Sequence, residues 1–475
     1  MLQRPTSILR DMFGIDARCL GVFRIVIASI LLADLALRSR FIVENYTDDG
    51  FLPRDLVVAP DCYMSLQMLN GSYAFQVGHF VLAALSGLML LVGYRTRTAT
   101  ALCWLLTISL HARNTFLLDA GDDLLRSMLF WSLFLPLGLR YSIDGRHVDG
   151  RRDVIPDQRI ILSASSAALL LQFACVYFFA GWFKTDPEWT AGTAIERALG
   201  QTQWIRPAGQ WLGQYPTLLR YMTPAVVWFE IIAPLCLFIP WRTRTIRMFV
   251  IPAFWMFQFG LGMTIWLHIF PLITAAATIP FLSSLIWPEE SEKNTKAETV
   301  TTAAGSKHTM RRRIVWNSAL AVLAATTIVI QAANFGKNFL PTEERIVSLI
   351  GWNAIWSMYT TTPKYSYQFS SEATLANGET IDLINSEVTT TDRMRVQQLH
   401  SSYRFRYFLE TASSACPGFP SRYLAHLVYR WNQTQTEDRF VVNARIIGTA
   451  KAIGEPGPGE STVLLEMGVG PAESE

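Results

Sequence analysis

The sequence carries little charge for its length. Of its 475 residues, 17% are charged and 51% are hydrophobic, whereas a soluble domain carries about 25% charge. The deficit lies in long apolar runs, which is the pattern of a protein that spans a membrane. The net charge of +3 is too small to indicate a nucleic-acid partner. We therefore expect membrane lipid, and no nucleic acid, around this chain.

Three other signals are missing. The first apolar run, Cys19 to Leu37, is too long for the core of a signal peptide, and no small-residue cleavage site follows it. We expect this run to be retained as a span. The seven histidines are scattered and no pair has metal-ligand spacing. No phosphate-binding loop is found either, so the sequence predicts no metal centre and no nucleotide site.

Nine apolar runs are predicted to cross the bilayer, for which a helix needs roughly 20 mostly apolar residues. The run from Met248 to Trp287 is too long for one helix and is interrupted at Gly260, Gly262 and His268, so we interpret it as a tight helical hairpin. The predicted spans are 19–37, 76–94, 98–118, 123–139, 160–183, 223–240, 247–265, 267–287 and 314–333.

The basic residues between these runs predict the orientation of the chain. Under the nine-span interpretation most of them fall on one side, which should be cytoplasmic, while Arg38, Arg40 and Arg54 fall on the other. The N-terminus is then cytoplasmic and residues 334–475 are extracytoplasmic. The residues on the cytoplasmic side are Arg4, Arg10, Arg18, Arg95, Arg97, Arg140, Arg146, Arg151, Arg152, Arg159, Arg242, Arg244, Arg247, Lys293, Lys296, Lys307, Arg311, Arg312 and Arg313.

The last segment has the composition of a small folded domain. Residues 365–370 and 439–447 alternate as strands do, and Asn377-Gly378 is a two-residue hairpin signal. Helices are expected near 393–412 and 419–431, and a short strand near the end.

The predicted fold class is an all-α polytopic membrane domain of about nine transmembrane helices with a small extracytoplasmic α+β C-terminal domain. The expected divisions are 1–290 for the transmembrane domain, 291–313 for a cytoplasmic linker, 314–333 for the last transmembrane helix and 334–475 for the extracytoplasmic domain.

Ionisable residues inside spans are candidate site residues because burying a charge in the bilayer is costly. Arg24 and Asp34 lie near the ends of the first span, so we expect Arg24 to snorkel and Asp34 to reach water. Asp122 and Arg126 are four residues apart at the start of the fourth span, and we expect them to pair. Either a capped helix with a surface ion pair or a buried polar network would explain this segment.

A lone lysine, Lys184, follows an aromatic apolar helix at its outer end. A buried amine loses its proton more easily and can act as a base near neutral pH. The alternative is a lysine that snorkels to the interface between Trp182 and Trp189. Residues 190–222 are amphipathic and not a span, so we expect an interfacial or re-entrant element over the outer face, where it could cover a cavity at membrane depth.

The stretch around Lys184 resembles the lysine motif of vitamin K-dependent gamma-glutamyl carboxylases and, more closely, that of their bacterial relatives, the HTTM (horizontally transferred transmembrane) domain proteins. It reads Tyr177-Phe-Phe-Ala-Gly-Trp-Phe-Lys184-Thr-Asp186-Pro-Glu-Trp189. Two further segments resemble the family in the same order, covering about residues 10–290. They are Arg113-Asn114 with Gly121-Asp122-Asp123-Leu-Leu-Arg126, and His268-Ile-Phe-Pro-Leu-Ile-Thr-Ala.

This resemblance implies a bacterial-type inner-membrane protein that uses a reduced quinone, either vitamin K hydroquinone or menaquinol, with Lys184 as the base that deprotonates it. The substrate would be a secreted peptide or protein. The residues implied to bind substrate are Arg113, Asn114, Asp122, Arg126, Tyr177, Trp189, Gln258 and His268. Gln258 aligns with a histidine of the carboxylases, and so does Asp122 after a gap. The alternative is a non-carboxylating protein that binds a quinone, lipid or peptide and assists a secreted partner.

Cysteine is also scarce, and only Cys62 and Cys416 of the six cysteines lie in aqueous segments. The predicted topology places both outside, where disulfides form, and the carboxylases similarly tie their first outer loop to a later lumenal segment. We expect a bridge between them that clamps the C-terminal domain onto the membrane domain. Two free thiols, with Cys416 in an ordinary turn beside Pro417, are the alternative.

If the bridge forms, unreduced denatured protein should show two fewer titratable thiols than reduced protein. Cys62→Ser should lower the stability by a few kcal/mol, because the bridge closes a long loop. Cys416→Ser should have the same effect, and the double variant no more than either one. Six reactive thiols in the unreduced protein would contradict the prediction.

Overall fold

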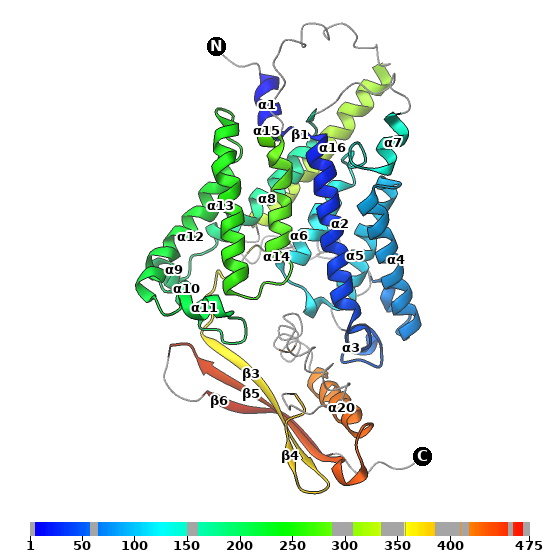
Figure 1. The fold of residues 1–475 in the computed structure, drawn as a ribbon, viewed down its shortest axis with the longest axis vertical. Coiled ribbons are helices and arrows are strands. Elements are labelled where there is room, and N and C mark those ends of the chain that lie inside the picture. Colours follow the sequence, from blue (N-terminus) through cyan, green and yellow to red (C-terminus); the bar gives the residue numbers. More distant parts are fainter. Residues whose placement is uncertain are drawn as a thin grey trace.

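The structure is a computed structural model that describes residues 5–57, 65–149, 160–286, 307–333, 356, 358–384, 409, 418–454 and 459–468. These residues form a bundle of long helices, and a β-sheet with one packed helix lies beyond one end of the bundle (Figure 1). The mostly helical part and the C-terminal sheet agree with the predicted fold class.

The long helices run side by side along the longest axis of the molecule (Figure 1). Five of them, α2, α4, α8, α12 and α13, are long and apolar enough to cross a membrane. The bundle helices are α2 (Ala17–Ser39), α4 (Tyr73–Val92), α5 (Thr96–Arg113), α6 (Ala120–Ser132), α8 (Ala164–Trp182), α12 (Pro216–Cys236), α13 (Thr243–Thr264), α14 (Phe270–Ala277) and α16 (Lys307–Ala333).

The described residues thus contain five candidate spans where nine were predicted. The other four predicted spans correspond to helices that are shorter or more polar. In α5 the polar side chains of Thr100, Thr107 and Ser109 are buried, so they face other helices rather than lipid. A hydropathy average cannot distinguish an inward-facing polar residue from an outward-facing one, which explains why α5 falls short by composition.

Short elements connect the bundle helices. Asp119 and Ser163 cap α6 and α8, each with a capping box, so their oxygens satisfy the first backbone N–H groups. The short elements are α1 (Pro5–Phe13), β1 (Ile15–Asp16), α3 (Ile42–Tyr46), η1 (Arg54–Leu56), η3 (Leu66–Met68), η4 (Thr115–Leu117), α7 (Ile143–Asp149), β2 (Ile160–Ile161), α9 (Pro187–Ala191), α10 (Ala194–Leu199), α11 (Pro207–Leu212), η5 (Ile279–Leu282), α15 (Ser283–Ile286) and η8 (Glu437–Arg439).

The C-terminal part is an antiparallel sheet in the order β4-β3-β5-β6. The helix α20 (Phe419–Asn432) packs on it, which confirms the helix expected near 419–431. The helix expected at 393–412 lies outside the described residues except for Leu409. Residues 287–306, which contain most of the expected linker, also lie outside them. The strands are β3 (Tyr365–Leu375), β4 (Thr380–Ile381), β5 (Val441–Ala452) and β6 (Glu460–Gly468).

Asn377-Gly378 marks a hairpin as predicted, but the turn is not the expected two-residue loop. Gly378 N–H donates to Leu375 O over 2.9 Å, and Leu375 N–H donates to Glu379 O over 2.9 Å. Only Gly378, at φ +83°, is left-handed, whereas the two-residue turn favoured by Asn-Gly needs two such residues. The loop is therefore one residue longer and ends in a left-handed glycine.

Arg24 is buried beneath the loop that follows α6. Its side chain is 1% exposed. It donates to the carbonyl of Tyr141 over 2.5 Å and to that of Leu137 over 3.4 Å. The loop after α6 folds back over α2. Its backbone carbonyls therefore accept hydrogen bonds from the guanidinium of Arg24 inside the protein.

The first loop of the bundle, between α2 and α4, holds the C-terminal part. Arg422 donates to the carbonyl of Asp48 over 3.1 Å, and the ring of His426 lies 3.1 Å from the carbonyl of Asp49. The rings of Phe51 and Tyr423 pack edge to face with centroids 5.0 Å apart. Helix α20 is therefore fixed to this loop by apolar and polar contacts together.

This junction should loosen in acid. Burial, followed by the nearby guanidinium of Arg430, lowers the pKa of His426 from 6.5 to about 4. The folded state thus disfavours the protonated ring. Its full stability is present above about pH 6.5 and is lost as the pH falls towards 4, by on the order of 1 kcal/mol after solvent screening.

We expect limited proteolysis of the C-terminal part to accelerate between pH 6.5 and 4.5. His426→Gln should remove most of this pH dependence, while Arg439→Gln, on the far side of the same part, should retain it. An unchanged pH profile in His426→Gln would contradict the assignment.

Candidate functional site

A cavity of about 710 Å³ opens among α12, α13, the short helices α10 and α11, and the segment 358–363. Its walls are mostly apolar and aromatic, with a few polar groups, as in ligand sites of 300–1,000 Å³. The expected element at 190–222 covers it, because α10, α11 and the residues between them contribute part of the wall. The residues of this element that line the cavity are Ile195, Ala198, Leu199, Gln201, Trp204, Leu212 and Met222.

Lys184 lies in the wall of this cavity and not in lipid or bulk water. Helix α8 ends at Trp182, and the lysine side chain folds back along it. Its Nζ donates to Glu230 Oε2 over 2.6 Å and to the carbonyl of Ala180 over 3.1 Å. It also lies 4.9 Å from the ring centre of Trp189. The amine is thus held rigidly by three partners.

Glu230, the partner of Lys184, was not singled out from the sequence. It lies in the middle of α12, which packs against α8, and its side chain is 9% exposed. A lone carboxylate in the apolar run 223–240 was the available signal, since such a residue is costly unless it is paired. The packing of two helices brings together groups 46 positions apart.

Tyr177 and Gln258 form a second buried polar contact beside the cavity. Gln258 Nε2 donates to the hydroxyl of Tyr177. Tyr177 lies about two turns before Lys184, and its side chain lines the cavity from α8. Gln258 stands behind Tyr177 rather than in the wall. An amide at this place holds the tyrosine but carries no transferable proton.

The segment 358–363 closes the cavity from the C-terminal side. Trp189 Nε1 donates to the carbonyl of Tyr359 over 2.8 Å. Asp186 Oδ2 accepts from the backbone N–H of Thr362 over 2.9 Å and from its hydroxyl over 3.2 Å. The stretch that follows Lys184 therefore holds the segment 358–363, which forms part of the cavity wall and leads into β3.

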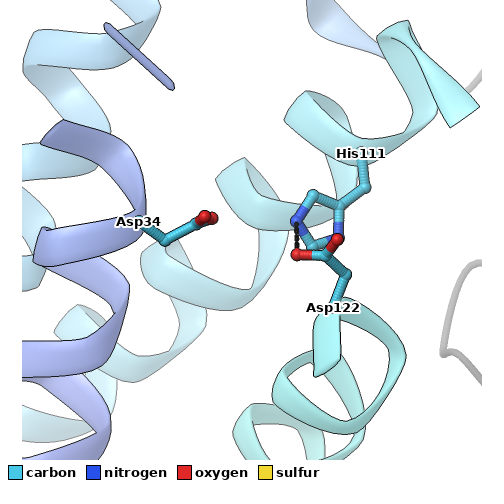
Figure 2. Close-up of side chains that lie close together, drawn as sticks. All are labelled: Asp34, His111 and Asp122. Carbon is cyan, nitrogen blue, oxygen red and sulfur yellow. Dashed lines mark ion pairs between the residues drawn. The ribbon is translucent and has the colours of Figure 1, made fainter. Parts of the chain in front are cut away.

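A separate group of charged side chains lies inside the bundle. Arg38 Nε is 2.7 Å from Asp34 Oδ2, and Arg38 Nη2 is 2.8 Å from Asp122 Oδ1. Figure 2 shows Asp34, His111 and Asp122, which come from three helices and point toward one another. Their ligand atoms lie within 4.8 Å of one another, so they are the group in the described chain that could hold a metal ion.

Two predictions about these residues are wrong. Asp34 does not reach water, because it is 1% exposed and pairs with Arg38 one turn further along α2. Asp122 pairs with Arg38 instead of Arg126, and Arg126 pairs with Asp123. The reason lies in the packing of the helices. Helix α14 packs against both α2 and α6, and this arrangement brings the guanidinium of Arg38 on α2 to Asp122 on α6.

His268 links this charged group to the cavity. Its Nε2 is 3.8 Å from Asp34 Oδ1, and its Nδ1 is 3.7 Å from Asp119 Oδ2. Asp119 lines the cavity. Through His268, the charged group therefore reaches Asp119 in the cavity wall.

Arg113 and Asn114 serve the first loop rather than the cavity. Arg113 Nη2 donates to the carbonyl of Leu52 over 2.9 Å, and Asn114 Nδ2 donates to the carbonyl of Asn45 over 3.2 Å. Of the predicted site residues, Tyr177, Lys184 and Trp189 thus share the cavity wall. Gln258 lies behind it, and Asp122 and His268 belong to the neighbouring charged group. Arg126 pairs with Asp123 beside that group, and Arg113 and Asn114 stand apart.

Comparison with known proteins adds one family. The HTTM domain matches residues 14–287, which contain the cavity-lining part of the bundle and both buried charged groups. No curated protein and no solved structure gives a match.

The buried pair Lys184–Glu230 yields a stability prediction. Removal of one partner leaves an uncompensated buried charge, so Glu230→Leu should lower the free energy of unfolding by about 3–5 kcal/mol. The double variant Lys184→Met/Glu230→Leu should recover most of that loss. Thermal unfolding in detergent measures both, and an additive double variant would contradict the pairing. Glu372→Leu, which breaks the exposed pair with Arg445, is the control and should leave the melting temperature unchanged.

Proposed function

The chain belongs to the HTTM domain family, and we propose that it is a membrane enzyme that binds a reduced quinone and removes a proton from it with the Lys184–Glu230 pair. The observation that carries this proposal is the lysine amine, buried in a cavity wall and held 2.6 Å from a carboxylate. Ionisable groups that are buried and paired in the wall of a cleft are typical of acid–base sites.

The proposed topology has nine spans, with a cytoplasmic N-terminus and an extracytoplasmic C-terminal part in a bacterial-type inner membrane. The five candidate spans support it, and so do α5, α6, α14 and α16, which run beside them (Figure 1). The one-sided loop arginines give the direction. In this arrangement Lys184 faces the outer half of the membrane, below the C-terminal part.

The cavity suits a reduced quinone by size and by chemistry. Its apolar and aromatic walls match a ring with a hydrocarbon tail. Met256, Phe257 and Gly260 of α13 line the cavity, and the side chain of Phe259 on the same helix is exposed. Among the polar groups of its wall, Lys184 and Glu230 form the ion pair, and Tyr177 belongs to the same wall. A hydroxylated ring would therefore be oriented with its oxygen toward the ion pair.

A reduced quinone supplies an acidic hydroxyl and the reducing equivalents that the carboxylases couple to oxygen. The residues of this chain supply the proton acceptor. Because Lys184 is already hydrogen-bonded to Glu230, the acceptor is the pair rather than an isolated neutral amine. A proton taken up at this site can rest on the Glu230 carboxylate, while the Lys184 ammonium offsets the negative charge left on the ligand.

A second function on the same scaffold is binding without carboxylation, in support of a secreted peptide or protein. The observation that favours it is Gln258, which holds Tyr177 by an amide hydrogen bond at the position that aligns with a histidine of the carboxylases. An amide cannot exchange a proton in that place. The cavity and its ion pair would then serve recognition of the ligand alone.

Purified protein supplied with reduced menaquinone, oxygen, labelled carbon dioxide and a glutamate-rich peptide separates these functions. We expect quinone oxidation by the wild type and a loss of at least about 100-fold per folded molecule in Lys184→Ala. The folded fraction is measured alongside, because this variant leaves Glu230 unpaired. Lys451→Ala, at an exposed position on β5, is the matched control and should turn over normally. Label in the peptide would establish carboxylation.

If the wild type binds menaquinone but does not oxidise it, the second function holds. If Lys184→Ala oxidises the quinone at the wild-type rate, the base assignment is wrong.

A further inference from the structure

The charged group behind the cavity contains a histidine that the protein itself leaves unsatisfied. The side chain of His111 is 0% exposed, and neither ring nitrogen has a hydrogen-bond partner among the described residues. A buried polar atom without a partner costs about 1–3 kcal/mol. The ring of His111 points into the space between Asp34 and Asp122 (Figure 2). A buried histidine aimed at two carboxylates is the arrangement of a ligand set.

We propose that Asp34, His111 and Asp122 bind a divalent transition-metal ion, with zinc as the first candidate. His111 Nε2 lies 3.5 Å from Asp122 Oδ1. Metal bonds of about 2.0–2.2 Å place neighbouring ligand atoms of one tetrahedral ion roughly 3.3–3.6 Å apart. The third ligand atom, from Asp34, lies within 4.8 Å of both, so a small rotamer shift completes the set.

The chemistry of the set favours a transition metal over calcium or magnesium. Imidazole suits zinc, iron and copper, whereas calcium and magnesium prefer oxygen ligands alone. Asp34, Asp122 and Arg38 together carry a net charge of −1, so a cation is favoured in their midst. Three protein ligands leave one position open, as in catalytic rather than structural zinc sites.

Arg38 and His268 have the contacts of an outer shell. Arg38 bridges Asp34 Oδ2 and Asp122 Oδ1, which fixes both carboxylates, as hydrogen-bonded groups do around metal ligands. His268 Nε2 stands 3.8 Å from Asp34 Oδ1, within reach of the open side. Through its other nitrogen it approaches Asp119 in the cavity wall, so an ion here lies next to the proposed quinone site without being part of it.

Metal analysis of the purified full-length protein tests this inference independently of any activity. After growth in zinc-supplemented medium and desalting, the wild type should retain about one equivalent of metal. His111→Gln and Asp34→Asn should lose it. His79→Gln is the matched control, because His79 is a buried histidine of the same bundle whose ring lies 3.2 Å from the carbonyl of Leu106, and it should retain the metal.

A second measurement on the wild type covers the case in which the variants do not fold. Cobalt added to chelator-treated protein should give visible absorption that saturates near one equivalent and is displaced by zinc. Zinc should also raise the melting temperature of the wild type but not that of a folded His111→Gln. Wild type that holds no metal and gives no cobalt spectrum would overturn the proposal, and so would metal retained in His111→Gln.

Discussion

A charge inside an apolar bundle must be neutralised by the protein, and this requirement shapes the interior of the molecule. Lys184 on α8 fixes Glu230 on α12, and Arg38 on α2 fixes Asp122 on α6. Arg24 and Arg247 donate to backbone carbonyls. Arg247 reaches those of Leu237, Asp11 and Met12. Each contact joins segments distant in sequence. Breaking one partner is therefore costlier than removing both.

The same contacts that neutralise charge also divide the interior into two compartments. One is the apolar cavity with the Lys184–Glu230 pair in its wall, open enough for a ligand. The other is the closed group in which Asp34, Arg38, His111 and Asp122 are buried. Asp119 belongs to both, since it lines the cavity and approaches His268. The closed group therefore lies next to the cavity, with His268 between Asp34 and Asp119.

The C-terminal part completes the cavity rather than merely following the bundle. The segment 358–363 supplies part of its wall and is held by Asp186 and Trp189, which directly follow the lysine. On the other side, α20 is fixed to the loop between α2 and α4. Packing of Phe51 against Tyr423 adds an apolar contact to the polar contacts of Arg422 and His426 at this junction.

The sequence alone determined the apolar runs, the polar C-terminal segment and the hairpin at Gly378, because these follow from composition and local propensity. It also made Lys184 a candidate, because a lone charge beside an apolar run is costly. It also indicated that residues 190–222 cover a cavity. It did not reveal Glu230 as a partner, and it placed Asp34 in water and Asp122 beside Arg126. Only the tertiary structure decided these pairings, since the side chains that meet come from different helices, and helix packing rather than spacing along the chain sets which charges lie within bonding distance.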